Sequence, residues 1–253
     1  MKIIKNIVPV VKIIGTLKPQ KKIFKKIHQA IEKNDPELER KYILESTSTW
    51  GDDIMTLLGS EIHVYGKENL PEEGPVVFMG NHQGYADIFT YCAVLDKFQF
   101  GFVAKEELGN LPFFCKQIHE IRSVFIDRDS ARGSMNAIVE GIKLIEQGYS
   151  LAIYPEGTRS KGGEPKPFMK GAIKLATKPG VPIVPISLEG TYKMLEQDGY
   201  FHGADVYIKI HEPVPTAGIS RKEEKELMPR IESIVMSGVE ELKAIAAEIE
   251  SKK

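Results

Sequence analysis

The chain has 253 residues, of which 42% are apolar and 27% are charged. This is typical of one large globular domain, or of a domain with an appended module, and excludes disordered, collagen-like and coiled-coil proteins. The two cysteines, Cys92 and Cys115, are too few for a disulfide framework, a CxxC redox pair or a four-cysteine zinc site. No segment approaches the roughly 18 consecutive apolar residues that span a bilayer, so we expect no transmembrane helix.

The net charge of −1 conceals a basic arm and an acidic body. Residues 1–33 contain nine lysines, no arginine and one acid, Glu32, whereas the remaining residues are acidic on balance. Basic arms bind polyanions, which are nucleic acids or anionic membrane surfaces. Bulky Ile and Val residues are interleaved with these lysines, and such side chains find no apolar contact along a phosphate backbone. The arm therefore favours a membrane surface over nucleic acid.

Lys12 interrupts the apolar run and no small-residue cleavage site follows, so we do not interpret the arm as a signal peptide.

Two helices are expected in the first 58 residues. Between Pro19 and Lys33, apolar residues recur at helical spacing and lysines occupy the other side of the helix. Asn34-Asp35-Pro36 predicts a stop, with a second helix from about Pro36 towards Leu58. We interpret residues 1–58 as a membrane-docking, amphipathic helical hairpin, with its apolar face in the acyl boundary and its lysines on anionic headgroups. The alternative is a helix packed on the body whose solvent face is basic. The apolar positions are Ile23, Phe24, Ile27 and Ile31.

In the second part of the chain, residues 59–253, short apolar runs alternate with longer periodic segments from residue 75 onward. This rhythm predicts an α/β domain with a largely parallel or mixed central sheet flanked by helices. Ligands of such sheets bind beyond the carboxyl ends of the strands. A final helix is expected from about Ser220, where Glu223 completes a capping box. The expected strands are 75–80, 98–104, 123–126, 150–154, 183–188 and 206–210, and the other expected helices are 88–96, 130–147 and 170–177.

The first strand-to-helix corner contains a histidine and an aspartate five residues apart, His82 and Asp87. On a continuous helix this offset would separate them by about 140°, so they can meet only if residues 81–86 form a turn. A carboxylate on one imidazole nitrogen fixes the tautomer and leaves the other nitrogen as a base. Asp87 as a simple helix cap beside an ordinary loop histidine is the alternative interpretation.

Cationic residues follow three other expected strands. Lys105 follows 98–104, Arg128 follows 123–126, and Arg159 lies in the turn after 150–154. If the strands are parallel, these side chains meet His82 at one edge of the sheet. A cationic site with a carboxylate-backed histidine suits an anionic substrate whose hydroxyl must be deprotonated.

Five successive segments, NHQGYAD, FVAKEEL, FIDR, YPEGTRS and VPIVPIS, resemble the conserved blocks of the glycerolipid acyltransferase family. They span roughly residues 75–190, and the resemblance is closest to the bacterial 1-acyl-sn-glycerol-3-phosphate acyltransferases. One position departs from the pattern, since Gly84 stands where the first block often has serine. The resemblance implies acyl transfer from acyl-CoA or acyl-carrier protein to the free hydroxyl of lysophosphatidic acid, with no further cofactor and no metal.

The resemblance also assigns roles by position. His82 is the general base on the acceptor hydroxyl and Asp87 orients it. Glu156 and Gly157 help to position the glycerol. The substrate phosphate is assigned to Lys105, Arg128 and Arg159. The basic hairpin resembles the membrane-docking element of the family, which places the protein peripherally on the cytoplasmic face of the cell membrane.

Three alternatives remain open at this point. Glycerol-3-phosphate or another lysolipid is a possible acceptor for the same mechanism. A noncatalytic peripheral lipid-binding protein would use the arm and the cationic edge only for anchoring. A metal hydrolase is disfavoured because its dispersed histidines, which are His63, His82, His119, His202 and His211, show no compact ligand spacing. Cys92, on an expected buried helix face, is interpreted as a core residue and not as a nucleophile.

Overall fold

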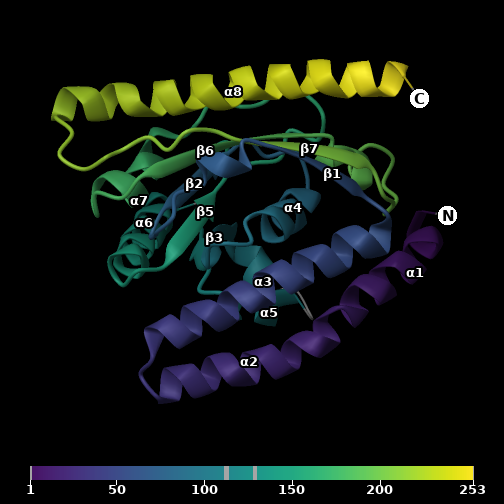
Figure 1. Cartoon of the computed structure of the whole chain (residues 1–253), viewed down its shortest axis with the longest axis horizontal. Helices are drawn as coiled ribbons and strands as arrows, with labels where there is room; N and C mark the ends of the chain where they lie inside the picture. The colour runs from purple at the N-terminus through teal and green to yellow at the C-terminus, as the bar shows by residue number, and fades with distance from the viewer. Residues whose placement is uncertain (1, 111–113, 128–129, 253) are drawn as a thin grey trace.

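The computed structural model describes residues 2–110, 114–127 and 130–252, which form a mixed sheet with helices on both faces (Figure 1). The α-helices are α1 (Lys2–Gly15), α2 (Leu17–Glu32), α3 (Pro36–Leu58), α4 (Ala86–Val94), α5 (Phe114–Glu120), α6 (Ala131–Glu146), α7 (Lys174–Thr177) and α8 (Arg221–Ser251). The strands are β1 (Glu61–Tyr65), β2 (Val77–Gly80), β3 (Phe100–Lys105), β4 (Val124–Ile126), β5 (Ser150–Ile153), β6 (Ile183–Glu189) and β7 (Asp205–Ile210). Short 3₁₀ helices are η1 (Lys67–Asn69), η2 (Glu106–Asn110), η3 (Lys170–Ile173) and η4 (Thr191–Met194).

The strand order is β1-β7-β6-β2-β5-β3-β4. Strands β6, β2, β5, β3 and β4 are parallel, whereas β7 runs antiparallel to β6 and pairs in parallel with β1. The predicted α/β class is therefore confirmed, and all six expected strands are present. β1, α5 and the separate helix α1 were not predicted. Because β1 and β7 run in the opposite direction, their first residues lie at the edge where β2 and β6 end.

Each face of the sheet has its own apolar core. On one face, Val77 and Leu151 pack with Ile231 and Val235 of α8, which crosses the sheet as a single long helix (Figure 1). On the other face, Phe78 and the neighbouring strands pack against α2 to α5. Covering both faces explains why the central strands are continuous apolar runs without alternation.

The predicted helix starts at Pro36 and Ser220 are both confirmed. The Leu38 amide donates to the Asp35 carboxylate at 3.0 Å, which caps α3. At the start of α8, the Glu223 amide donates to the Ser220 hydroxyl, and the Ser220 amide donates to the Glu223 carboxylate. The capping box therefore fixes where α8 begins.

The apolar face of α2 is buried inside the protein, which corrects the expectation that it contacts lipid. Ile23, Phe24 and Ile27 are 8%, 4% and 1% exposed, because α3 and α5 pack against this face. The exposed aliphatic side chains of the arm lie instead mainly on α1, which ends before α2 begins. They are Ile7, Val8 and Val11 on α1 and Ile31 at the end of α2. Within the described chain, no helix combines the length and the apolar character required to cross a bilayer.

Candidate active site

His82 and Asp87 come together at the loop that joins β2 to α4. The chain leaves β2 at Gly80, turns through residues 81–85 and enters α4 so that Asp87 lies in its first turn. His82 Nδ1 lies 2.6 Å from Asp87 Oδ2. The predicted turn is therefore present, and it brings together two residues that a continuous helix would separate.

The Asp87 carboxylate is fully buried and collects several donors. Its Oδ2 accepts hydrogen bonds from the backbone amides of Gln83 at 2.7 Å and Gly84 at 3.1 Å. Its Oδ1 accepts from the hydroxyl of Thr191, at the start of η4. The carboxylate oxygen held by these donors accepts from the Nδ1–H of His82, which places the imidazole proton on Nδ1. Nε2 is then the nitrogen with a free lone pair.

The plane of the His82 imidazole is fixed by stacking. The ring lies on the Tyr154 ring with centroids 4.3 Å apart and planes 7° apart. Tyr154 is buried with its neighbour Tyr91, and burial raises the pKa of both phenols well above the usual value. Both rings therefore remain neutral aromatic walls beside the imidazole.

Glu156 ties the second predicted turn to the first. Its Oε1 accepts a hydrogen bond from the backbone amide of His82 at 2.7 Å, and its Oε2 accepts one from the backbone amide of Lys166 at 2.9 Å. Two backbone hydrogen bonds, Ser160 N–H to His82 C=O and Lys161 N–H to Gln83 C=O, join the same loops. Burial raises the pKa of Glu156, while the two amides oppose this shift. Oε1 of Glu156 thus holds the loop of His82, Oε2 holds the segment of Lys166, and Gly157 forms the turn with a φ of +72°.

A cavity of about 250 Å³ opens beside His82 at the carboxyl ends of β2, β5 and β3. Lys105 and Arg159 line it together with His82, so this part of the predicted convergence is confirmed. Arg128, also predicted to lie here, is outside the described residues. The other lining residues are Tyr85, Ile88, Phe102, Val103, Ala104, Leu108, Tyr154 and Thr158.

The two described cations of this cavity both have acidic neighbours. Lys105 Nζ lies 2.5 Å from a carboxylate oxygen of Glu107, in an exposed ion pair. Arg159 Nη1 donates to Glu196 Oε1 at 2.7 Å, and its guanidinium lies 3.7 Å from the centroid of the Tyr85 ring. The Glu196 side chain is 4% exposed, so the second pair is largely shielded from water.

Sequence analysis did not identify Glu196. Its Oε1 also accepts the Tyr85 amide at 3.0 Å, and its Oε2 is buried without a hydrogen bond from any described residue. A Cβ on Gly84 would lie 2.5 Å from that Oε2, so the glycine leaves space for the glutamate. The serine that the family often has at this position would require Glu196 to shift. No local motif marks Glu196, because it follows Arg159 by 37 residues.

A second cavity, of about 200 Å³ and walled by apolar side chains, adjoins the first. The two cavities share Tyr85, Ile88 and Leu108 as lining residues. The remaining walls come from the amino-terminal helices, α4, α5 and the segment before β7. They are Val10, Ile13, Trp50, Phe89, Phe114, Ile118, Leu195 and Phe201.

Cys92 is fully buried in α4, and burial raises the pKa of its thiol. A buried neutral thiol is a poor nucleophile, so its interpretation as a core residue is confirmed.

Comparisons with known proteins agree with this architecture. The family model described as Acyltransferase matches residues 61–189. A 1-acyl-sn-glycerol-3-phosphate acyltransferase of Borreliella burgdorferi is 34% identical over 190 residues, which are 74% of this chain and 75% of that protein. One of Bacillus subtilis is 28% identical and covers 75% of this chain and 91% of its own length. The crystal structure of the 1-acyl-sn-glycerophosphate acyltransferase PlsC from Thermotoga maritima superposes with a TM-score of 0.78 at 32% identity, covering 96% of this chain and 98% of that one. The chain belongs to the acyltransferase family, and residues 61–189, which include the His82–Asp87 corner, are the part that the family model matches.

Proposed function

We propose that this protein transfers an acyl group from a thioester to the free hydroxyl of 1-acyl-sn-glycerol-3-phosphate, giving phosphatidic acid. The relatives that it resembles carry this activity in their names. The observation that carries the proposal is the position of the His82–Asp87 pair at a cationic cavity that adjoins an apolar one. A substrate with a hydroxyl, a phosphate and an aliphatic chain matches these three features in order.

In the proposed mechanism His82 acts as general base. Nε2 accepts the proton of the substrate hydroxyl while its oxygen attacks the thioester carbonyl carbon. The carbon–sulfur bond then breaks, and the thiolate leaves with the proton that the imidazolium returns. The buried Asp87 carboxylate, 2.6 Å from Nδ1, stabilises the imidazolium throughout. A positioned base of this kind typically accelerates the reaction about 10²–10⁴-fold.

The substrate phosphate is assigned to Lys105 and Arg159, with Arg128 remaining a candidate. A guanidinium binds phosphate through two parallel hydrogen bonds, so Arg159 is the more selective contact. Since Arg159 already binds Glu196, an entering phosphate competes with a carboxylate for the same guanidinium. Glu156 and Gly157 support this arrangement by fixing the loop of His82, and a contact with the glycerol stays a prediction for both.

The apolar cavity is assigned to an aliphatic chain. The described residues of its walls include no cation or carboxylate, and burying methylene groups there contributes about 0.8 kcal/mol each. Because Tyr85, Ile88 and Leu108 line both cavities, a chain held in the apolar cavity would enter from the side of His82.

We propose that the protein docks peripherally on an anionic membrane at the cytoplasmic face through α1 and α2. Ile7, Val8 and Val11 expose 52%, 60% and 61% of their surface, beside a run of exposed lysines on α2.

Replacing both Val8 and Val11 by Asp should reduce co-sedimentation with anionic vesicles, and raised salt should weaken binding of the unaltered protein. Val139→Asp, at an exposed valine on α6, is the matched control. Equal binding by all three proteins would contradict docking through α1.

The decisive experiment measures thiol release from a long-chain acyl-CoA in mixed micelles, with and without lysophosphatidic acid. Release that requires this acceptor and disappears in His82→Ala would support the transferase and its base together. Parallel reactions with glycerol-3-phosphate or another lysolipid test the alternative acceptors, and acyl-carrier protein tests the alternative donor. Release without any acceptor would indicate a thioesterase. No release with either donor and any of these acceptors would contradict catalysis and favour a lipid-binding protein.

A further inference from the structure

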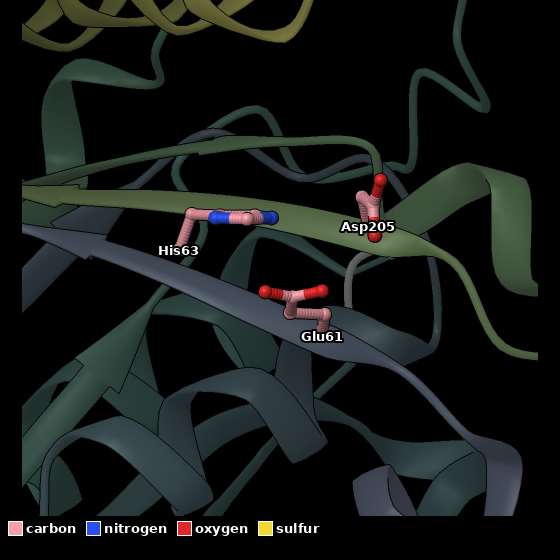
Figure 2. Close-up of side chains that lie close together, drawn as sticks. All are labelled: Glu61, His63 and Asp205. Atoms are coloured by element: carbon pink, nitrogen blue, oxygen red, sulfur yellow. The ribbon is translucent and has the colours of Figure 1, made fainter. Parts of the chain in front are cut away.

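A second cluster of polar side chains lies on β1 and β7. Glu61 and His63 are two residues apart on β1, so they point to the same face of the sheet. Glu61 pairs with Asp205 in the register of the parallel strands, and His63 pairs with Tyr207. Figure 2 shows the His63 ring and the Glu61 carboxylate beside the Asp205 side chain, which comes from the start of β7. Tyr207 packs with Leu242 and Ala246, so this is the face that α8 covers.

The three side chains offer donor atoms close enough to share one ion. One ring nitrogen of His63 and one carboxylate oxygen from each of Glu61 and Asp205 all lie within 4.8 Å of one another. The His63 ring is held against the Tyr207 ring, with centroids 4.6 Å apart and planes 14° apart. Its Nε2 is buried and makes no hydrogen bond within the described chain. A buried ring nitrogen without a partner is costly, and metal coordination would satisfy it.

The charges of the two carboxylates also favour a bound cation. Glu61 and Asp205 place two carboxylates on adjacent strands, and like charges at this distance repel each other. Among the described residues, Glu61 forms no ion pair with a lysine or an arginine within 4.0 Å. A cation between the carboxylates converts this repulsion into attraction.

We propose that Glu61, His63 and Asp205 bind one divalent transition-metal ion of the zinc class. An imidazole nitrogen with two carboxylate oxygens is a ligand set that Zn²⁺ accepts, whereas Mg²⁺ and Ca²⁺ prefer oxygen ligands alone. Zinc bonds of about 2.0–2.2 Å keep ligand atoms within about 4.4 Å of one another, so any donors near the 4.8 Å limit of the cluster must move closer together. Glu61 is exposed and can make this movement, and water completes the coordination shell.

The site would connect the edge strand β1 to β7. It also lies next to a segment that supports the active site. The Asp205 carbonyl oxygen lies against Gly190, where a Cβ would be only 2.5 Å away. The next residue, Thr191, donates its hydroxyl to Asp87. A metal ion would therefore hold the strand end on which this segment rests. The proposal does not depend on the reaction assigned to His82.

The test uses the full-length protein after treatment with a chelator that is then removed. Titration with Zn²⁺ in a calorimeter should show one site per chain, and Zn²⁺ should raise the thermal unfolding temperature. His63→Ala and Glu61→Gln should each weaken Zn²⁺ binding at least about tenfold and reduce the thermal shift. Excess Mg²⁺ should not displace the Zn²⁺. Circular dichroism of the metal-free variants checks that they are folded, and the exposed Glu61→Gln provides a conservative change if His63→Ala unfolds.

The matched control is His28→Ala. His28 Nε2 lies 2.8 Å from a Glu120 oxygen, so this pair resembles the cluster, but no third ligand among the described residues joins it. The control should bind Zn²⁺ like the unaltered protein. If all variants bound Zn²⁺ with equal affinity, the ion would bind elsewhere in the protein and the proposal would be overturned. Binding weaker than millimolar in the unaltered protein, or displacement by Mg²⁺, would overturn it as well.

Discussion

The cavity beside His82 is lined by one member of each of two pairs of charged or polar side chains, and these pairs are organised in opposite ways. In the first pair, the Asp87 carboxylate receives hydrogen bonds from His82, two backbone amides and Thr191, and so holds the imidazole in one orientation. In the second pair, the Glu196 carboxylate neutralises Arg159, the residue assigned to the substrate phosphate. Asp87 orients His82 for the proposed reaction, whereas Glu196 binds the guanidinium of Arg159 that the substrate phosphate would use.

The difference indicates when each pair acts. The His82–Asp87 geometry is complete before substrate arrives, so it needs no rearrangement at the moment of proton transfer. In the proposed mechanism, the Arg159–Glu196 pair would open or share its guanidinium when the phosphate enters. Glu196 Oε2 is buried without a hydrogen bond from the described residues, so this carboxylate is only partly satisfied even while it binds Arg159.

The largest expected effect comes from removing the base. His82→Ala and Asp87→Asn should each lower kcat by about 10²–10⁴-fold with a folded protein, since both abolish the oriented imidazole. His119→Ala, at an exposed histidine on α5, should retain full turnover. Steady-state kinetics with circular dichroism on the same preparations provides the measurement. Turnover within a factor of a few in Asp87→Asn would show that the carboxylate only caps α4.

Arg159→Ala should act on binding and not on the chemical step. A charged hydrogen bond contributes about 1.5–3 kcal/mol, so the KM for the acceptor should rise about 10–100-fold. The KM for the acyl donor should stay nearly constant. Initial rates at varied acceptor and donor give the two constants separately. An equal rise in both would argue that Arg159 supports the loop and does not bind phosphate.

A loss of activity in acid can be attributed to the His82–Asp87 and Arg159–Glu196 pairs only at pH values where the protein stays folded. His211 limits that pH range. Burial, with Lys209 nearby, lowers the pKa of His211 from 6.5 to about 4. The folded protein therefore binds this proton less readily than the unfolded chain. His211 contributes its stabilisation above pH 6.5 and loses it as the pH falls towards 4.

Allowing for the partial exposure of the His211 ring, the free energy of unfolding should decrease by about 1–2 kcal/mol between pH 7 and pH 5. Urea unfolding at both pH values measures this decrease. His211→Gln should flatten the pH dependence. An unchanged slope in that variant would mean that another group controls acid stability.

Glu196→Gln should produce the smallest change in the KM for the acceptor. The change should be opposite in direction to that caused by Arg159→Ala. The amide keeps an acceptor for the Tyr85 backbone but no longer neutralises the guanidinium. Exposed ion pairs contribute about 0.2–1 kcal/mol, and this pair, exposed only through the 24% of Arg159, belongs at the upper end of that range, so the KM for the acceptor should fall by about two- to fivefold. Phosphate inhibition constants measured alongside should fall in parallel. A higher KM would show that Glu196 orients Arg159 towards the substrate and does not compete with it.

Sequence patterns predicted the central sheet well, because buried parallel strands are continuous apolar runs and their flanking turns are rich in glycine and proline. β1 was missed although Ile62 and Val64 alternate with polar neighbours, since a five-residue edge strand carries a short and weak signal. The His82–Asp87 pair was predictable because both residues lie in one corner. Glu196 and Thr191 were not, because folding brings them to the site from a distant segment that has no motif of its own.

The burial of the α2 apolar face could not be foreseen from its periodicity. A helical stripe such as Ile23, Phe24 and Ile27 looks the same whether it faces lipid or protein. What distinguishes the two is the neighbouring helix α3, whose packing depends on the whole chain.

Helix α1 has two faces with different consequences for the evolution of the chain. Val10 and Ile13 line the apolar cavity, whereas Ile7, Val8 and Val11 point outwards. Inward positions are constrained by volume, so substitutions there should track the length of the aliphatic chain that each relative accommodates. Outward positions are constrained only by hydropathy, and they can exchange one aliphatic residue for another freely. If the apolar cavity holds an aliphatic chain as proposed, removing α1 would alter chain-length selectivity and any affinity for a surface at the same time.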